Sequence, residues 1–109
     1  MELIDDAGQV ERIALAFRAL SHPTRLRILE ALRSEVSLSP SEMLDRVGRG
    51  TGLPNVAYHT RELAALGLLV PAGRRPVRGA LEHFYRLTPR GRELTELVER
   101  AAAGLADSR

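Results

Sequence analysis

The sequence predicts a mainly helical domain that carries one small two-stranded β-hairpin. Three observations support this fold class. Apolar residues recur at helical spacing through most of the 109 residues, and proline stands at the start of several of these patterns. A stretch rich in glycine, proline and arginine near residues 71–80 is flanked by runs of strand-forming residues.

Two helices are expected in the first third of the chain. The first covers about residues 6–20, with an apolar stripe made of Val10, Ile13, Ala14, Phe17 and Leu20. The second runs from Pro23 to about Ser34, because proline is tolerated in the first turn of a helix but not in its interior. Ser21 is expected to cap it. Its inward residues are Leu26, Ile28, Leu29 and Leu32.

A helix–turn–helix unit is expected next. After a short extended piece at 36–38, Ser39 and Glu42 have the spacing of a capping box, which starts a third helix that buries Met43, Leu44 and Val47. The glycines at 48–52 end that helix. A fourth helix begins around Leu53 and runs to Leu66, and Gly67 follows as its C-terminal glycine.

The remaining elements are a hairpin and a last helix. Residues 68–70 and 81–88 are expected to be strands, and the glycine-, proline- and arginine-rich segment between them a loop. Thr88 and Pro89 then start a helix to about residue 106. The order helix, helix, short strand, helix, helix, strand, strand, helix is typical of a winged helix-turn-helix domain. We therefore expect one domain over 1–109: a helix over 1–20, a core over 23–88 that includes a wing over 68–88, and a helix over 89–106.

Charge is distributed unevenly along the chain. The net charge is only +2, but residues 46–92 contain nine arginines against two acidic residues, whereas the segments on either side are acidic overall. A basic middle segment is what a surface that meets a polyanion requires, although a solvated basic surface without a partner is the alternative. We expect double-stranded DNA as the partner.

Several classes of function are disfavoured. The chain has no cysteine, which removes thiolate metal sites and thiol redox chemistry, and its three histidines lack the paired spacing of a zinc site. We therefore expect no metal and no cofactor. No nucleophile elbow, phosphate-binding glycine loop or HExxH motif occurs, so no enzymatic activity is expected. No apolar run is long enough to span a membrane, and the acidic N-terminus is unlike a signal peptide. These features predict a cytoplasmic protein.

The fourth helix offers the residues expected to read DNA bases. Leu53, Val56, Thr60 and Leu63 define its inner face, which leaves a polar outer face that fits the major groove. The expected base-contacting residues are Asn55, Tyr58, His59 and Glu62. An ordinary solvated face is the alternative, and it applies most strongly to Glu62, because a glutamate must find a cytosine amine or stay clear of phosphates.

Arginines of the hairpin are expected to contact the DNA backbone or a narrow minor groove. The expected backbone-contacting residues are Arg49, Thr51, Arg61, Arg74, Arg75 and Arg78. Arg25 and Arg27 are weaker candidates, for which an intramolecular ion pair is equally expected.

Three segments resemble the ArsR (arsenical-resistance repressor) family of bacterial winged-helix regulators. These segments are ALSHPTRLRIL at 19–29, VAYHTREL at 56–63 with GLL at 67–69, and YRLTPRG at 85–91. The resemblance covers about residues 10–100. It implies that 56–63 belong to the recognition helix, that the first helix serves dimerisation, and that the protein is a repressor.

Two positions differ from that family. Many members bind metal through a cysteine pair just after a glutamate, whereas Ser37 and Ser39 follow Glu35 here. Thr60 stands where the family usually has a core leucine, and it can hydrogen-bond its own backbone. If the protein responds to a signal, an apolar ligand between the terminal helices or a protein antagonist fits better than a metal ion.

The terminal helices carry apolar stripes larger than so small a core can cover, which favours a homodimer. The expected dimerisation residues are Val10, Ile13, Phe17, Leu94, Leu97, Val98, Ala101 and Leu105. The whole pattern predicts a sequence-specific transcriptional regulator, a homodimeric repressor of an inverted-repeat operator. A protein-interaction module or a nonspecific DNA binder is the alternative, because winged helices serve those roles too.

Overall fold

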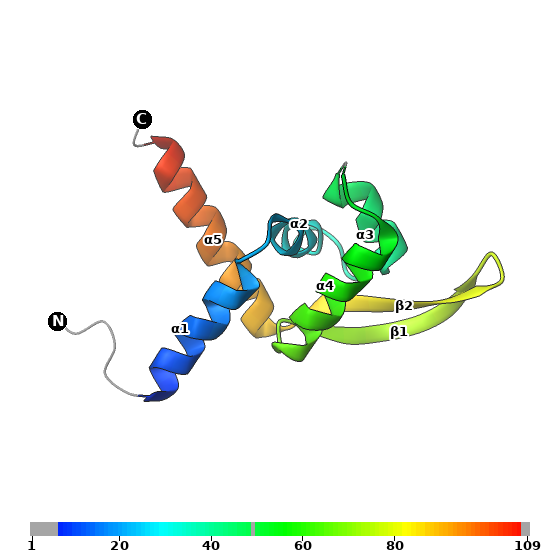
Figure 1. Ribbon diagram of the computed structural model, residues 1–109, viewed down its shortest axis with the longest axis horizontal. Coiled ribbons are helices and arrows are strands. Elements are labelled where there is room, and N and C mark those ends of the chain that lie inside the picture. Colours follow the sequence, from blue (N-terminus) through cyan, green and yellow to red (C-terminus); the bar gives the residue numbers. More distant parts are fainter. Residues whose placement is uncertain (1–6, 49, 108–109) are drawn as a thin grey trace.

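A computed structural model describes residues 7–48 and 50–107. In chain order its elements are α1 (Ala7–Ala19), α2 (Pro23–Ala31), α3 (Pro40–Val47), α4 (Leu53–Ala65), β1 (Leu69–Val77), β2 (Ala80–Leu87) and α5 (Pro89–Asp107) (Figure 1). Five helices and one antiparallel hairpin confirm the predicted winged helix-turn-helix fold. No helix within the described ranges is long and apolar enough to cross a membrane.

The core lies where α2, α3 and α4 pack on the base of the hairpin. Its most deeply buried residues come from these helices, from the residues just after α2 and α4, and from the start of β1, namely Ile28, Leu29, Leu32, Met43, Val47, Val56, Leu63, Leu68 and Leu69. Thr60 is also fully buried, and its Oγ1 donates to the Val56 carbonyl at 2.8 Å. That bond confirms the expected contact of Thr60 with its own backbone and removes the cost of an unpaired buried hydroxyl.

Helix starts are only partly as predicted. The capping box of α3 is confirmed, because Ser39 Oγ accepts from the Glu42 amide at 3.3 Å and the Ser39 amide donates to Glu42 Oε1 at 3.0 Å. The expected cap of α2 by Ser21 is wrong. His22 holds the N-cap position without a side-chain bond, and Ser21 Oγ instead donates to the Arg18 carbonyl at 2.7 Å, which closes the end of α1.

The end of α4 and the start of α5 are joined. Gly67 has φ +80° and ends α4 in a Schellman motif, in which its amide donates to Ala64 and the Leu68 amide donates to the Leu63 carbonyl, both at 3.0 Å. Thr88 Oγ1 accepts from the Gly91 amide at 3.0 Å and donates to the Gly67 carbonyl at 2.7 Å. One threonine side chain therefore caps α5 and fixes it to the end of α4.

The hairpin differs from the prediction in its length. The segment expected to be a loop continues both strands, and the connection is only Arg78–Gly79, with φ values of +52° and +81°. Two residues with positive φ are what a two-residue hairpin turn needs. Prolines are tolerated because each strand of a two-stranded sheet is an edge, and a bulge between Pro71 and Gly73 absorbs one residue.

The expected extended piece at 36–38 is reduced to one bridging residue. Leu38 and Tyr85 exchange backbone hydrogen bonds at 3.0 and 2.9 Å. This bridge attaches the α2–α3 connection to β2. In Figure 1 the hairpin extends to one end of the molecule, whereas α1 and α5 diverge at the other.

Gly91 lies where the first turn of α5 approaches the backbone of Leu68, at the base of the hairpin. A Cβ at this position would lie 2.1 Å from the Leu68 carbonyl oxygen. We predict that Gly91→Ala lowers the unfolding free energy by about 1–3 kcal/mol, measured by urea denaturation of the full chain. Gly104→Ala, in the same helix with open space around it, should raise stability by about 0.5–1 kcal/mol. A Gly91 variant as stable as the wild type would contradict this packing.

Candidate nucleic-acid interface

The outer face of α4 carries three of the four residues predicted to read bases. Asn55 and Tyr58 are exposed, and the carboxylate side chain of Glu62 is 45% exposed. Gly52 holds the N-cap position of α4 without a side-chain cap, and its carbonyl accepts from the Asn55 and Val56 amides, both at 3.1 Å. Leu53, predicted to face inward, is instead 41% exposed at this end.

Asn55 is held in a defined orientation. Its Nδ2 donates to Thr51 Oγ1 at 2.7 Å, one turn back. Its second N–H and its carbonyl oxygen are not used in that bond. An asparagine amide that offers one donor and one acceptor side by side is the group that pairs with the adenine edge.

His59 does not face outward as predicted. It is only 6% exposed, and its Nδ1 accepts a hydrogen bond of 3.0 Å from Arg25 Nε. The rings of His22 and Tyr58 lie 4.8 and 5.1 Å from its ring centroid. Since the side chain is enclosed by α2 and its neighbours, His59 is withdrawn from the set of base-contacting residues.

The Arg25 guanidinium joins three helices. Arg25 lies on α2 and is 6% exposed. Besides the bond to His59 on α4, its Nη1 donates to the Arg18 carbonyl in α1 at 2.9 Å. Its Nη2 lies 3.8 Å from Glu62 Oε1 on α4. The intramolecular ion pair expected for Arg25 is therefore present, and the charge of Glu62 is partly balanced.

These neighbours keep His59 neutral. Burial lowers the pKa of His59 below its ordinary value of 6.5, the Arg25 and His22 charges lower it further, and Glu62 acts in the opposite direction. A lowered histidine pKa means that the unfolded chain binds the proton more readily than the folded one. The stability contributed by neutral His59 is therefore complete above pH 6.5 and is lost as the pH falls through the lowered pKa.

The wing arginines are not equivalent. The Arg75 guanidinium carbon lies 4.3 Å from the centroid of the Phe84 ring, a cation–π contact within the hairpin. Arg74 instead pairs with His83 across the two strands. Arg78 occupies the exposed turn. Arg61 is exposed on α4, and Arg49 lies outside the described residues.

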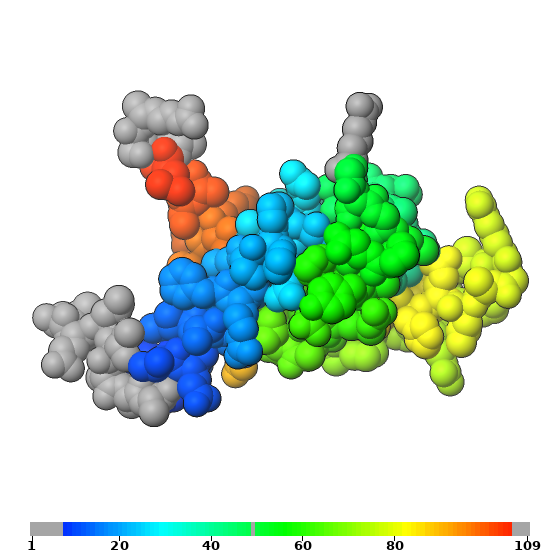
Figure 2. Space-filling view, in the orientation of Figure 1, coloured from blue at the N-terminus to red at the C-terminus, as the bar shows by residue number. Residues whose placement is uncertain are grey.

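In Figure 2 the green surface of α4 adjoins the yellow surface of the hairpin, so these elements form one face.

The terminal helices expose part of their predicted dimerisation stripes. Val10, Phe17, Leu97 and Leu105 are 46%, 69%, 53% and 73% exposed. Leu94, predicted to lie on the same stripe, is only 9% exposed and packs in the chain's own core. Val98 is half-buried against that core, Ile13 is partly buried, and Ala101 is exposed.

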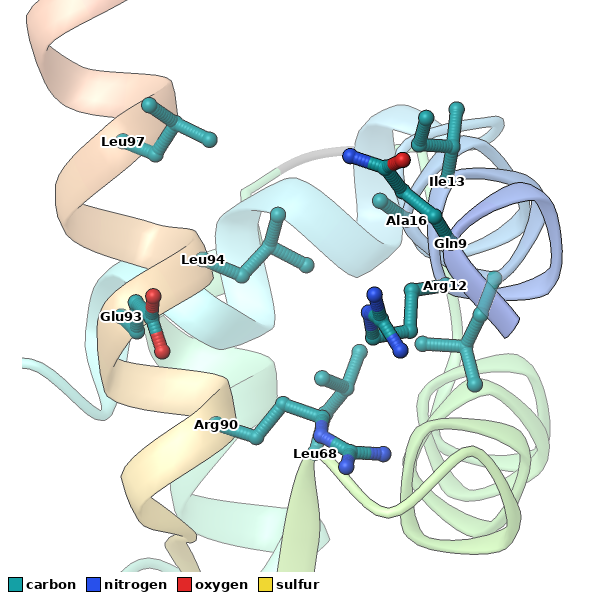
Figure 3. Close-up of a pocket in the computed structure, with 10 residues that line it drawn as sticks. Gln9, Arg12, Ile13, Ala16, Leu68, Arg90, Glu93, Leu94 and Leu97 are labelled. Atoms are coloured by element: carbon teal, nitrogen blue, oxygen red, sulfur yellow. The ribbon is translucent and has the colours of Figure 1, made fainter. Parts of the chain in front are cut away.

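A cavity of about 540 Å³ lies between α1 and α5 (Figure 3). Its walls are mainly apolar, and the side chains of Arg12 and Arg90 extend toward it from opposite sides. Ile13 and Leu97 line it as well, so the cavity reaches the residues that are exposed on the terminal helices. No group of three or more metal-ligating side chains occurs among the described residues.

Sequence reasoning missed the burial of His59 and the central position of Arg25. One signal was present. His59 stands three residues after Val56 and four before Leu63, so it borders the apolar stripe as closely as Thr60 does. A polar residue there needs a buried partner. The sequence does not show that Arg25, 34 residues earlier, supplies it.

Comparisons with known proteins agree with this fold. A family model described as a helix-turn-helix domain matches residues 20–71, which contain α2, α3 and α4. Among curated proteins, none matches the chain significantly.

Three solved structures illustrate the likeness. The AntR antimony-specific transcriptional repressor is 24% identical, with a TM-score of 0.73 over 100% of this chain and 91% of that one. The repressor BigR from Xylella fastidiosa is 27% identical, with a TM-score of 0.64 over 85% of each chain. A homodimeric winged helix-turn-helix DNA-binding domain from Mycobacterium bovis, described as a possible ArsR-family regulator, is 20% identical, with a TM-score of 0.70 over 100% and 96%. Together these likenesses confirm the fold and support a DNA-binding regulator.

Proposed function

We propose that this protein is a sequence-specific transcriptional repressor that binds an inverted-repeat operator as a homodimer. The observation that carries the proposal is one exposed face on which the polar side of α4 adjoins an arginine-bearing hairpin. The basic segment 46–92 contains both elements. This arrangement suits a helix in the major groove, about 12 Å wide, with a wing along the backbone.

Base reading is assigned to the exposed residues of α4. Asn55 and Tyr58 face base edges in this docking, and Glu62 lies beside them with part of its charge balanced by Arg25. That balance reduces the repulsion between a carboxylate and the phosphates. Thr51 and Arg61 flank the same face and would contact phosphates.

Backbone contacts are assigned to the wing. Among the described residues the Arg74 and Arg78 side chains have no hydrogen-bond or ion-pair partner, whereas Arg75 is already engaged with Phe84. We therefore assign phosphate or minor-groove contacts first to Arg74 and Arg78, and to Arg75 in part. Arg49 stays a candidate on sequence grounds alone.

The exposed apolar residues of α1 and α5 support dimerisation. Val10, Phe17, Leu97 and Leu105 lose contact with water when two copies pair about a two-fold axis, and such interfaces are self-complementary. The homodimeric domain from Mycobacterium bovis, which shares this fold, supports the same assembly. Sedimentation should then give twice the chain mass of 12.0 kDa.

An effector site is proposed in the cavity between α1 and α5. Its apolar walls suit a small apolar molecule, and the charged side chains at its border have both signs, with Arg12 and Arg90 beside Glu93. Because Ile13 and Leu97 line the cavity and belong to the dimerisation stripes, a ligand there would alter how two copies pair. A protein antagonist on the same helices would act on the same contacts.

Selection of bound duplexes from a random-sequence pool tests the proposed function. We expect a palindromic consensus whose half-site centres are about 34 Å apart, because two α4 helices of a dimer enter successive major grooves on one side of the duplex. Recovery of duplexes without a common sequence would indicate a nonspecific binder. No retained DNA at low salt would favour a protein-interaction module.

Substitutions should separate base contacts from phosphate contacts. Asn55→Ala or Tyr58→Phe should reduce the binding free energy on the selected operator by on the order of 1–3 kcal/mol per lost base contact. The loss on random DNA should be far smaller. Arg74→Ala or Arg78→Ala should lower the affinity for the operator and for random DNA alike. Either change should also flatten the slope of log affinity against log salt by up to about two units per dimer. Fluorescence anisotropy at several salt concentrations measures both effects.

Arg100→Ala is the matched control, because it removes the same charge from an exposed position on α5. It should leave operator affinity and its salt slope close to those of the wild type. Changed sequence preference in the wing variants, with unchanged preference in the α4 variants, would reverse the assignment of roles.

A further inference from the structure

One cluster of polar side chains is centred on the buried Arg25 and His59. It consists of Arg25 on α2, His59 and Glu62 on α4, and His22 just before α2. Arg25 also binds the Arg18 carbonyl in α1. The cluster therefore connects the base-reading helix to the helix proposed for dimerisation.

We propose that Arg25 and His59 form an acid-sensitive joint that positions α4 for DNA. Neutral His59 holds α4 against α1 and α2, and protonated His59 releases it. Arg25 and His59 are positioning residues in this scheme, because they act through the helix that presents Asn55 and Tyr58. The inference deepens the proposed function and rests on it.

The hydrogen bond exists in one protonation state only. Arg25 Nε donates and His59 Nδ1 accepts, so the neutral ring carries its proton on Nε2. An arginine has no acceptor to offer. When Nδ1 gains a proton, two donors and two positive charges meet at 3.0 Å, and the bond is replaced by repulsion.

Glu62 opposes this repulsion only in part, because burial of His59 and the Arg25 and His22 charges outweigh it. His22, the N-cap residue of α2, has its ring centroid 4.8 Å from that of His59. On α4 itself, Tyr58 presents a ring at 5.1 Å, and Glu62 is shared with Arg25 at 3.8 Å. From α1 the Arg18 carbonyl accepts from Arg25 Nη1 at 2.9 Å. Burial and these charges together explain the lowered pKa of His59.

Release moves α4 without unfolding it. Val56, Thr60 and Leu63 on the inner face remain in the core, and the Schellman motif and Thr88 still hold the end of the helix. What is lost is the Arg25–His59 hydrogen bond, which connects the middle of α4 to α2 and, through the Arg18 carbonyl, to α1. The base-reading side chains then lose their fixed position relative to the dimer, and an operator with fixed half-site spacing is bound less tightly.

His59→Asn removes the titratable group and keeps a hydrogen-bond acceptor for Arg25. The asparagine Oδ1 stands close to the place of Nδ1 and can accept from Arg25 Nε, but it does not titrate in this range. His83→Asn is the matched control, because it removes an exposed histidine from β2, outside the cluster. All variants are compared as full chains whose folding is verified by circular dichroism.

The first measurement uses the free protein. Nitrogen-15 NMR of the imidazoles between about pH 8 and pH 5 should show His59 as the Nε2-H tautomer with a pKa below 6.5. Amide exchange in the middle of α4 should accelerate as His59 gains its proton, and His59→Asn should remove that acceleration. The proposal would be overturned if His59 Nδ1 carried a proton at neutral pH. It would also be overturned if amide exchange in α4 did not change as His59 is protonated.

The second measurement uses a duplex with the selected consensus. Wild-type affinity should fall by about tenfold per pH unit and per subunit below the pKa of His59, because only the neutral form is competent to bind. His83→Asn should follow the wild type, and His59→Asn should lose the dependence. Equal pH dependence in wild type and His59→Asn would refute the joint.

The two measurements separate two kinds of failure. If no duplex is bound at any pH while the NMR titration behaves as expected, the proposed function fails and the joint stands. If the operator is bound but α4 does not respond to His59, the function stands and the joint fails.

Discussion

The position of α4 depends on a single buried guanidinium. Arg25 donates hydrogen bonds to the Arg18 carbonyl of α1 and to His59 of α4, and it forms an ion pair with Glu62 of α4. Its side chain therefore connects α1, α2 and α4. A buried arginine is costly unless its donors are occupied, and here the partners are a carbonyl, an imidazole nitrogen and a carboxylate. Close packing of Val56, Thr60 and Leu63 in the core holds the inner face of α4. The polar contacts of Arg25 add directional bonds at the middle of the helix, next to the base-reading residues.

The rest of the interface is fixed by small polar contacts at element ends. Thr88 caps α5 and binds the last turn of α4, the Leu38–Tyr85 bridge attaches β2 to the core, and Asn55 is oriented by Thr51. Each of these lies on the margin of the apolar core, not inside it. As a result α4 and the hairpin share one core, while α1 and α5 extend from it and expose apolar side chains. The dimer proposed here would add the missing partner for that surface.

Much of the fold could be predicted because local signals dominate it. The capping box at Ser39, the glycine at 67 and the Thr88–Pro89 start each act over a few residues, and the structure confirms all three. The hairpin was predicted too short, because proline and glycine were read as loop residues although a two-stranded sheet tolerates them. The orientation of His59 and the occupation of Arg75 by Phe84 depend on residues that only the fold brings together. The exposed residues Asn55 and Tyr58 were predictable, since helical periodicity alone places them opposite the core.

The most direct test of the central interaction is a double-mutant cycle of Arg25→Met and His59→Leu on the unfolding free energy. Each substitution removes one partner of the hydrogen bond, and the cycle isolates the coupling between them. At about pH 8 we predict a favourable coupling of at least about 1 kcal/mol, as expected for a buried hydrogen bond to a charged donor. It should vanish as the pH falls through the pKa of His59. A coupling below about 0.3 kcal/mol at pH 8, or one that does not change with pH, would contradict the account.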